Sequence, residues 1–463
     1  GESRREEEEL DSHGGPMIAA SRGAVEPPGP LSPRVSRRRG GDAHAARIQR
    51  WSTAPATCMI AGDMRVLLAL LVAATAGTRA LAAPQASGPR GLAMGGTGVA
   101  SSDPWTAPFT NPALTRFRDE GTGRSVMLPF LTATVRDDEG FLPAVDGYQD
   151  ALDELKAQID AMDPGAPAQR SAVVTRLQGL EGRTVNGETE VGFAALVPME
   201  DYSACLWMRV RGEGRAFPDI ATSDLVTITN PLSTSADLED LDSEAVAIAA
   251  QRTEFGATFA VEGAFGTHDD ARRVSFGITP KVQWIETYNY AIALDEFAIG
   301  DALRDLRDTQ YERSSSAFNV DLGLAAELEK GAIVGLAIRD VFRQDHPMIA
   351  TGGREFSYRV QPRTTLGVAV ERAGLSFSAD VDLTRTRNFR EAPASQFFRM
   401  GVEANVFGQA QLRAGFAHDF EDGLSDLVSL GLGFSPAETA RVDVVTQFGD
   451  NSVGAGFQIA LTL

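Results

Sequence analysis

The chain has 463 residues, a formal net charge of −20 and 46 glycines, but only two cysteines. So acidic a balance excludes a protein that binds nucleic acid through a basic surface, and no nucleic acid contact is expected. No apolar run reaches the roughly 18 residues that a membrane-spanning helix needs. Moderate hydrophobicity with abundant glycine is instead typical of a β-barrel, in which only alternate residues are apolar.

The first 82 residues have two different compositions. Residues 1–63 combine a glutamate run with arginine-rich, proline-rich stretches and no periodicity, which indicates a disordered or wrongly assigned N-terminal extension. Residues 64–82 begin with Met64 and Arg65, continue with an apolar run and end in Ala80-Leu81-Ala82. This pattern predicts a secretory signal peptide, cleaved near Ala82, although a short core helix is an alternative. Only Cys205 follows it, so no internal disulfide is expected.

Residues 88–114 are too rich in Gly, Ala and Ser to form a strand or a helix of their own. Gly95, Gly96 and Gly98 suggest a dinucleotide-binding loop. That interpretation fails because Ser101 replaces the third glycine, no buried strand precedes the segment and no helix follows it.

A first strand is predicted over Ser125–Val135, and a helical insert over 142–181 follows it. The insert contains two runs of apolar residues at three- and four-residue spacing, typical of amphipathic helices. Helices of this kind cannot form barrel wall, so they must lie in an extracellular loop or inside the lumen. Docking a partner and covering the pore mouth are both open as their role.

Further strands are predicted on both sides of an acidic, serine-rich insertion near residues 237–244. The insertion lacks the spacing of a calcium-binding EF-hand loop, which favours a solvated loop. The strands are Glu190–Met199, Ser203–Gly212, Glu254–Phe265, Val274–Tyr290, Phe318–Glu329 and Ala332–Val341.

The last hundred residues alternate strictly between apolar and polar positions, in segments of about ten residues. A soluble β-sandwich also alternates, but ten residues is the length of a tilted strand that crosses a bilayer. The non-apolar face combines glycine with charge, which indicates the wall of a lumen. Its charged, lumen-lining residues are predicted to be Asp380, Asp382, Arg399, Glu403, Arg413 and Asp443.

Counting hairpins over 125–463 predicts an all-β fold, a transmembrane antiparallel up-and-down barrel of about 14 strands. Tight turns near residues 330, 373 and 408 alternate with long loops at 301–313, 344–356 and 387–395. Outer-membrane barrels place such short turns in the periplasm and the long loops outside.

Several short motifs resemble a known family. They are RGLAMGGTGVA (Arg90–Ala100), NPAL (Asn111–Leu114), GITPKVQWIETYNY (Gly277–Tyr290), GLAIRDVF (Gly335–Phe342), QPRTTLGVAV (Gln361–Val370) and SADVDLT (Ser378–Thr384). Together they resemble the TraF-like conjugal transfer family, within the wider group of outer-membrane barrels that includes the FadL channels and the PorV proteins. The resemblance implies the outer membrane of a Gram-negative bacterium, with membrane lipid and other envelope or conjugation components as partners.

The same resemblance implies that the opening segment, residues 83–124, forms a hatch at the periplasmic mouth. An N-terminal turn that packs on the barrel is the alternative. The hatch residues expected from the matching motif are Met94, Gly95, Gly96, Gly98, Asn111 and Pro112.

No catalytic, cofactor-binding or metal-binding residue is predicted, and the protein is not expected to be an enzyme. None of His268, His346 and His418 lies in a nucleophile elbow or a metal-spaced cluster. Asp380 and Asp382 are neighbours on one strand face, which favours a lumen network with Arg399 or Arg413 over acid–base catalysis. The lumen carboxylates also predict cation preference in an open pore.

Two functions remain open at this point. One is a conjugal-transfer, envelope-assembly or secretion component without catalytic activity. The other is a passive, FadL-like channel for small or hydrophobic solutes. The polar inward positions favour the first, because a channel for hydrophobic molecules should have an apolar bore. The oligomeric state cannot be read from the sequence.

Overall fold

The computed structural model describes residues 88–117, 124–266, 271–300, 309–329, 331–406, 408–437 and 439–462. The chain divides into two units, Gly1–Ala56 and Thr57–Leu463, and all described residues belong to the second. The predicted extension over 1–63 and the predicted signal peptide over 64–82 lie outside the described residues.

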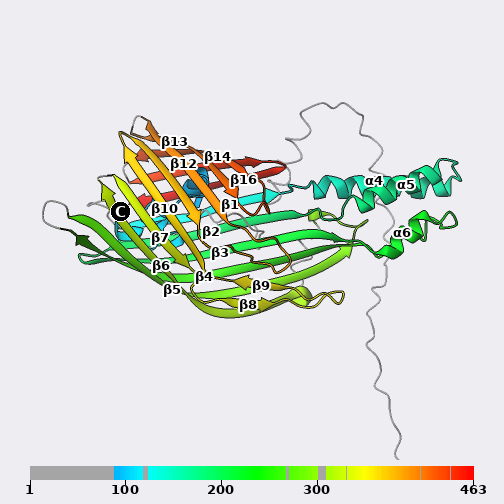
Figure 1. Ribbon diagram of the computed structural model, residues 1–463, viewed down its shortest axis with the longest axis horizontal. Helices are drawn as coiled ribbons and strands as arrows, with labels where there is room; N and C mark the ends of the chain where they lie inside the picture. Colours follow the sequence, from blue (N-terminus) through cyan, green and yellow to red (C-terminus); the bar gives the residue numbers. More distant parts are fainter. Residues whose placement is uncertain are drawn as a thin grey trace, which may run out of the picture. The chain divides into compact units, whose positions relative to one another are not determined.

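The second unit is a closed barrel of 14 antiparallel strands, which confirms the fold predicted from the sequence (Figure 1). Each strand pairs with its neighbours in the chain, and β16 pairs with β1 to close the barrel. β7 pairs directly with β10, because β8 and β9, which lie between them in the sequence, form a separate two-stranded sheet. The first half comprises β1 (Ser125–Arg136), β2 (Val185–Pro198), β3 (Tyr202–Asp219), β4 (Glu244–Phe265), β5 (Arg272–Ala293), β6 (Glu312–Glu329) and β7 (Ala332–Arg339). The second comprises β10 (Arg363–Arg372), β11 (Leu375–Asp382), β12 (Phe397–Val406), β13 (Ala410–Asp419), β14 (Leu427–Ala437), β15 (Ala440–Gly449) and β16 (Ser452–Thr462).

The two ends of the barrel differ in their connections. β1 begins and β16 ends at the same end, where Ser125 pairs with Thr462. The short β2–β3, β10–β11 and β12–β13 turns lie at this end too, and the long connections lie at the other. By the general pattern of outer-membrane barrels, the short-turn end faces the periplasm and the long connections are extracellular.

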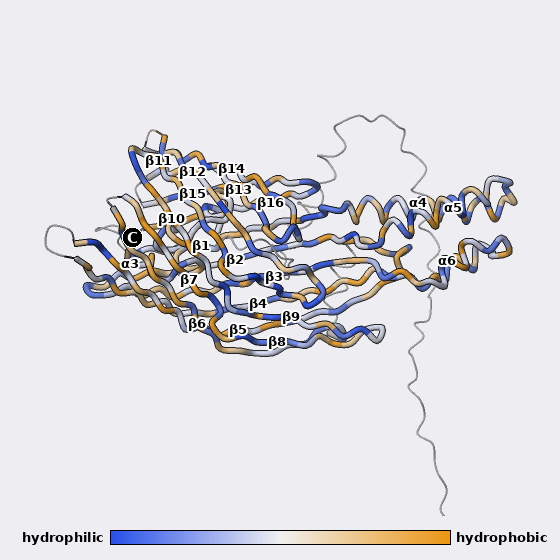
Figure 2. Tube along the Cα trace, in the orientation of Figure 1, coloured by the Kyte–Doolittle hydropathy of each residue, from blue (hydrophilic) through white to orange (hydrophobic). Residues whose placement is uncertain are grey.

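Side chains alternate between the two faces of the wall. In β11, Phe377 is 54% exposed on the outside, whereas Asp380 is 3% exposed inside. The same alternation of orange and blue follows the strands in Figure 2. Because lipid cannot solvate polar groups, an apolar outer face and a polar inner face are what a bilayer-spanning strand requires.

β4 and β5 each have 22 residues, about twice the length that a bilayer needs. In the extracellular part of β4, Val246 and Ile248 belong to a cluster with residues of β9 (Ser357–Val360) and with Met348, which follows β8 (Gln344–Pro347). On the opposite face, Ala247 and Ala249 belong to the cluster that contains the helices. This part of the wall is therefore covered on both faces. The predicted start of the strand at Glu254 is wrong by ten residues for this reason, because a doubly covered strand does not alternate.

Helices α4 (Phe141–Asp160) and α5 (Ala166–Gln178) lie where the apolar spacing predicts them, and α6 (Thr222–Thr229) is an additional short helix. They project past the extracellular end of the barrel, outside the lumen (Figure 1). Asp137 begins α4 by accepting hydrogen bonds from the Phe141 and Leu142 amides, at 2.5 and 3.1 Å. Burial raises the pKa of Asp137 to about 6. None of the described helices has both the length and the hydropathy of a membrane span.

Candidate functional site

Residues 88–117, here called the luminal segment, lie inside the barrel at its periplasmic end. The segment contains three short helical turns, α2 (Gly88–Ala93), η1 (Ala107–Phe109) and α3 (Leu114–Phe117), and nearly all of its residues are buried. It follows the inner wall from β16, where Gly88 approaches Gln458, to β3, where the Thr115 hydroxyl hydrogen-bonds that of Ser203 at 2.9 Å. The segment thus occupies the periplasmic half of the lumen.

A series of inward-facing wall glycines lies under this segment, and we call it the glycine track. A Cβ at Gly415 would lie 1.9 Å from the Gly95 nitrogen, and one at Gly335 would lie 2.1 Å from the Val99 carbonyl oxygen. Any side chain at these positions would displace the segment, so its backbone rests directly on the backbone of the wall. The track consists of Gly277, Gly323, Gly335, Gly367, Gly401, Gly415 and Gly431.

All six residues expected to form a hatch lie in the luminal segment, and most of them contact the wall. Met94 lies against Gly401, and Pro112 against Gly277 and Gly323. Gly95 and Gly96 have φ angles of 71° and 95°, a region that favours glycine. The Asn111 side chain donates to the carbonyl oxygens of Val99, at 2.7 Å, and of Leu324 in β6, at 3.0 Å.

Asp380 and Asp382, neighbours on β11, have different partners. One carboxylate oxygen of Asp380 accepts the backbone amides of Gly98 and Val99, at 2.8 and 3.0 Å, and so holds the luminal segment. Asp382 accepts two parallel hydrogen bonds from Arg399, both 3.0 Å long. The predicted network therefore includes Arg399 for Asp382, whereas Arg413 lies in another cluster.

The remaining predicted lumen residues form the Arg90 cluster, which joins α2 to β12, β13 and β15. Arg90 donates two hydrogen bonds of 3.0 Å to Glu403 and a third of 2.6 Å to the Ser101 carbonyl oxygen. Burial lowers the pKa of Arg90, but Asp103 and Glu403 raise it more, so the group stays charged. The cluster balances three arginines with three carboxylates: Arg90, Asp103, Glu403, Arg413, Arg441 and Asp443.

Sequence reasoning missed a second ionic cluster on β3 to β7. The ammonium of Lys281, which is 2% exposed, lies 2.8 Å from Asp340, 2.9 Å from Asp321 and 3.2 Å from Glu254. Arg209 and Arg252 complete it through Glu254 and Asp340. Glu254 and Lys281 lie at polar positions in stretches that were predicted as strands, so their inward direction could be read from the sequence. Their convergence with residues of neighbouring strands could not.

The C-terminal part of the luminal segment is held by apolar contacts instead. The ring of Phe109 lies edge-on to those of Phe130 and Trp207, with centroids 5.7 and 5.2 Å apart. Cys205, a buried free thiol, belongs to the same apolar cluster.

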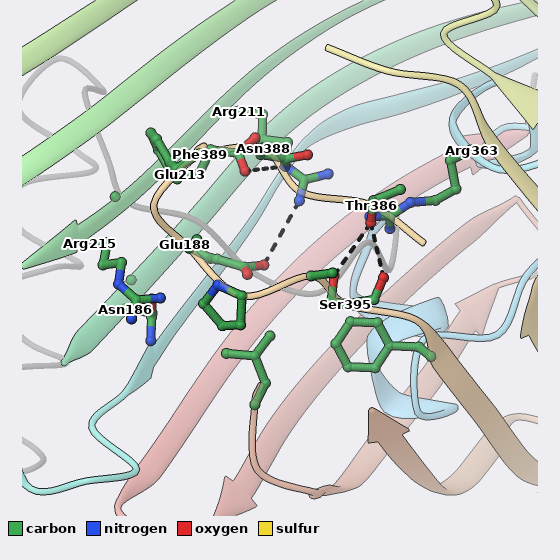
Figure 3. Close-up of a pocket in the computed structure, with 17 residues that line it drawn as sticks. Asn186, Glu188, Arg211, Glu213, Arg215, Arg363, Thr386, Asn388, Phe389 and Ser395 are labelled. Carbon is green, nitrogen blue, oxygen red and sulfur yellow. Dashed lines mark hydrogen bonds and ion pairs between the residues drawn. The ribbon is translucent and has the colours of Figure 1, made fainter. Parts of the chain in front are cut away.

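The extracellular half of the lumen contains a cavity of about 100 Å³ (Figure 3). Arg211, between Glu188 and Glu213, lies 3.9 Å from each carboxylate. Arg215 and Arg363 also line the cavity, together with the loop that carries Thr386, Asn388 and Ser395. In the part of the chain that the structure describes, no group of His, Cys, Asp and Glu is arranged to hold a metal ion.

The wall is closed and antiparallel, its outer face is apolar, and its polar lumen contains the luminal segment. These features define an outer-membrane β-barrel. More specifically, the chain belongs to the family described as the F plasmid transfer operon TraF protein, whose model matches residues 108–382. No curated protein matches the sequence.

Solved structures with a similar chain trace include a hydrocarbon channel, a toluene transporter and a FadL homologue. The deltaS2S3 mutant of the monoaromatic hydrocarbon channel TodX is 12% identical, with a TM-score of 0.47, over 81% of this chain and 99% of that one. The Ralstonia pickettii toluene transporter TbuX is 14% identical, with a TM-score of 0.45, over 82% and 99%. A Pseudomonas aeruginosa FadL homologue is 13% identical, with a TM-score of 0.44, over 83% and 98%.

Proposed function

We propose that this protein is a closed, non-catalytic outer-membrane component of a conjugal-transfer, envelope-assembly or secretion apparatus, in which the luminal segment acts as the hatch. The observation that carries the proposal is the backbone-to-backbone contact along the glycine track. Buried ion pairs tie the segment to the wall as well, which supports a lumen that is closed in its periplasmic half.

Export to the outer membrane is part of the proposal. Residues 64–82 would act as the signal peptide, with cleavage near Ala82, and residues 1–63 would not belong to the exported protein. The hatch would then begin close to the mature N-terminus and comprise residues 83–124. Membrane lipid is the partner of the apolar outer face.

The extracellular helices offer a docking surface for another envelope component. Their distal tip exposes Met162, Leu232 and Val226, at 91%, 85% and 66%. Helix α5 is tied to α6 and the loop after it, because Arg170 of α5 donates to the carbonyl oxygens of Ile228 and Ser233 at 2.9 and 2.7 Å. Exposed apolar side chains on a rigid support are typical of protein–protein contact sites.

Two measurements test the proposal. Single-channel recordings of the purified intact protein in planar bilayers should stay near baseline, and deletion of residues 88–117 should produce clear conductance. In the native host, loss of the gene should lower conjugal transfer or secretion, and a variant with Met162→Asp and Leu232→Asp should not restore it. Large steady conductance from the intact protein would contradict the closed state.

A passive channel is the second candidate, and the extracellular cavity is the observation that favours it. A solute could be held there before the hatch opens. In that case, loss of the gene should slow uptake of the solute, while conjugal transfer and secretion remain normal.

A further inference from the structure

We propose that the extracellular cavity is a binding site for a small carboxylate anion, held by Arg363, Arg215 and Arg211. The inference is independent of the proposed function, because a closed assembly component does not require a ligand in its lumen. It rests on arginines that the cavity brings together without enough carboxylates to pair them.

Arg363, the first residue of β10, is the central group. Its side chain lines the cavity although the residue is only 5% exposed. It donates one hydrogen bond of 2.5 Å, to the Thr386 hydroxyl, and its buried Nε has no acceptor. Among the described residues, no carboxylate lies within ion-pair distance of it. A buried guanidinium without a counter-charge is costly, so the arrangement calls for an anion.

The charges around Arg363 increase this need. Its strongest electrostatic neighbours are Asp382 and three further arginines, Arg339, Arg399 and Arg211. Asp382 does not supply the missing counter-charge, because both of its oxygens already accept hydrogen bonds from Arg399.

Arg215 is a second arginine without an ion pair, although Glu139 lies close enough to interact with it electrostatically. It lines the same cavity, and in the described part of the chain it has neither a hydrogen bond nor an ion pair. Figure 3 shows it on the opposite side of the cavity from Arg363. An anion between the two would be approached by a guanidinium from each side.

The cavity also contains carboxylates, and their positions decide whether it can accept an anion. Glu213 accepts hydrogen bonds from the Tyr358 hydroxyl and from the Asn388 side chain, one on each oxygen. Glu188 lies 3.9 Å from Arg211. Together they neutralise at most two of the three guanidinium groups in the lining, so one positive charge remains in excess.

The remaining lining selects the kind of anion. Phe389, Pro393, Phe397 and Leu424 form an apolar part of the wall next to the arginines. The planar fork of arginine matches a carboxylate, and the apolar wall suits a short hydrocarbon body. A volume of about 100 Å³ equals that of roughly three water molecules. The ligand class is therefore a short-chain carboxylate, of which propionate is the probe.

Calorimetric titration of the intact, detergent-solubilised protein tests the site. Propionate should bind, and its neutral isostere propionamide should bind at least about tenfold more weakly. Arg363→Gln should weaken propionate binding by a similar factor, whereas Arg116→Gln, at a half-buried arginine of the luminal segment that does not line the cavity, should have no effect. Faster migration on unheated than on boiled SDS gels checks that each variant is folded.

A second variant keeps the test decisive if Arg363→Gln does not fold. Ala394→Asp places a carboxylate in the cavity lining, and it should abolish propionate binding by taking the place of the ligand. Three results would overturn the proposal: no propionate binding by the intact protein, equal binding of propionamide, or equal binding by the folded variants. Tighter binding of inorganic phosphate would remove the hydrocarbon-binding part of the proposal.

Discussion

The two ends of the luminal segment are held by different kinds of interaction. Residues 88–103 lie on β7 and β10 to β16, and they are held by the Arg90 cluster, by the Asp380 carboxylate and by contact with the glycine track. Residues 105–117 lie on β1 to β6, where the rings of Phe109, Phe130 and Trp207 pack together.

The difference indicates which end would open first. Residues 88–103 form the polar end of the segment, and residues 105–117 form its aromatic end. Hydrogen bonds and ion pairs depend on direction, so the polar end loses most of its contacts with the wall once its backbone shifts. Apolar packing is less directional, and the aromatic end is also close in sequence to β1. We therefore expect a hatch that opens at residues 88–103 while the aromatic end acts as the hinge.

The largest effect is expected from Gly415→Val. Its Cβ would lie 1.9 Å from the Gly95 nitrogen, a clash that only displacement of the polar end relieves. Conductance in planar bilayers should rise clearly above that of the intact protein. Amide hydrogens of residues 88–103 should exchange fast, while those of 105–117 stay protected.

Gly263→Val is the matched control for this change. It is also a strand glycine, in β4, but a Cβ there would meet no atom within 4 Å. Its conductance and exchange should equal those of the unchanged protein. If both valine variants conducted equally, the glycine track would not be what closes the barrel.

Phe109→Ala should release the aromatic end, because loss of the buried ring should lower the stability of its packing by about 3 to 5 kcal/mol. The natural thiol of Cys205 reports on it, because Cys205 is buried in the same cluster. Cys205 is the only cysteine after residue 82, so maleimide should label the exported variant much faster than its parent.

The control is Phe255→Ala, which removes a ring from the lipid-facing side, where Phe255 is 43% exposed. Labelling of Cys205 should not change. Fast labelling in Gly415→Val as well would mean that the two ends open together, contrary to the hinge.

A strand could be predicted from the sequence when its two faces have different surroundings. β10 to β16 were predicted because lipid covers one face and the lumen the other, so their residues alternate. The extracellular part of β4 was missed because both faces are covered, as the run around Ile248 shows. The inward glycines were recognised as lumen wall, but their contact with the luminal segment required the register of neighbouring strands.

The charges were predicted less well than the strands. Asp382, Glu403 and Asp443 do face the lumen, but each is paired with an arginine. The predicted cation preference rested on these carboxylates and on Asp380, and of the four only Asp380 has no arginine partner among the described residues, so most of that basis is lost. Pairing partners come from distant strands, so no short sequence pattern reveals them. Because Arg215 and Arg363 line the described lumen without an ion pair, we now expect an opened pore to prefer anions.

A smaller effect is expected from Arg90→Lys, which keeps the charge of the polar end but removes the planar fork. The two bonds to Glu403 and the bond to Ser101 cannot all be made by an ammonium, so docking should weaken by about 1.5 to 3 kcal/mol. Hydrogen exchange of residues 88–103 measures the change. Arg116→Lys, at a half-buried arginine that bonds the Met199 and Glu200 carbonyls at the other end of the segment, should leave the exchange of residues 88–103 unaltered. An equal effect of both changes there would mean that the fork of Arg90 has no role.

The smallest effect is expected from Asp380→Asn, because two consequences oppose each other. The hydrogen bonds from Gly98 and Val99 lose a charged acceptor, which weakens each by roughly 1 kcal/mol. In return, a buried charge is removed whose other oxygen, Oδ1, has no hydrogen-bond partner among the described residues, and which lies close to Asp382. The net loss should therefore be about 1 kcal/mol, seen as slightly faster exchange at Gly98 and Val99 alone.

Ser376→Ala is the matched control, since this buried serine of β11 also has an oxygen without a partner. If Asp380→Asn opened the pore as Gly415→Val should, the carboxylate rather than the glycine track would be the main closure of the polar end.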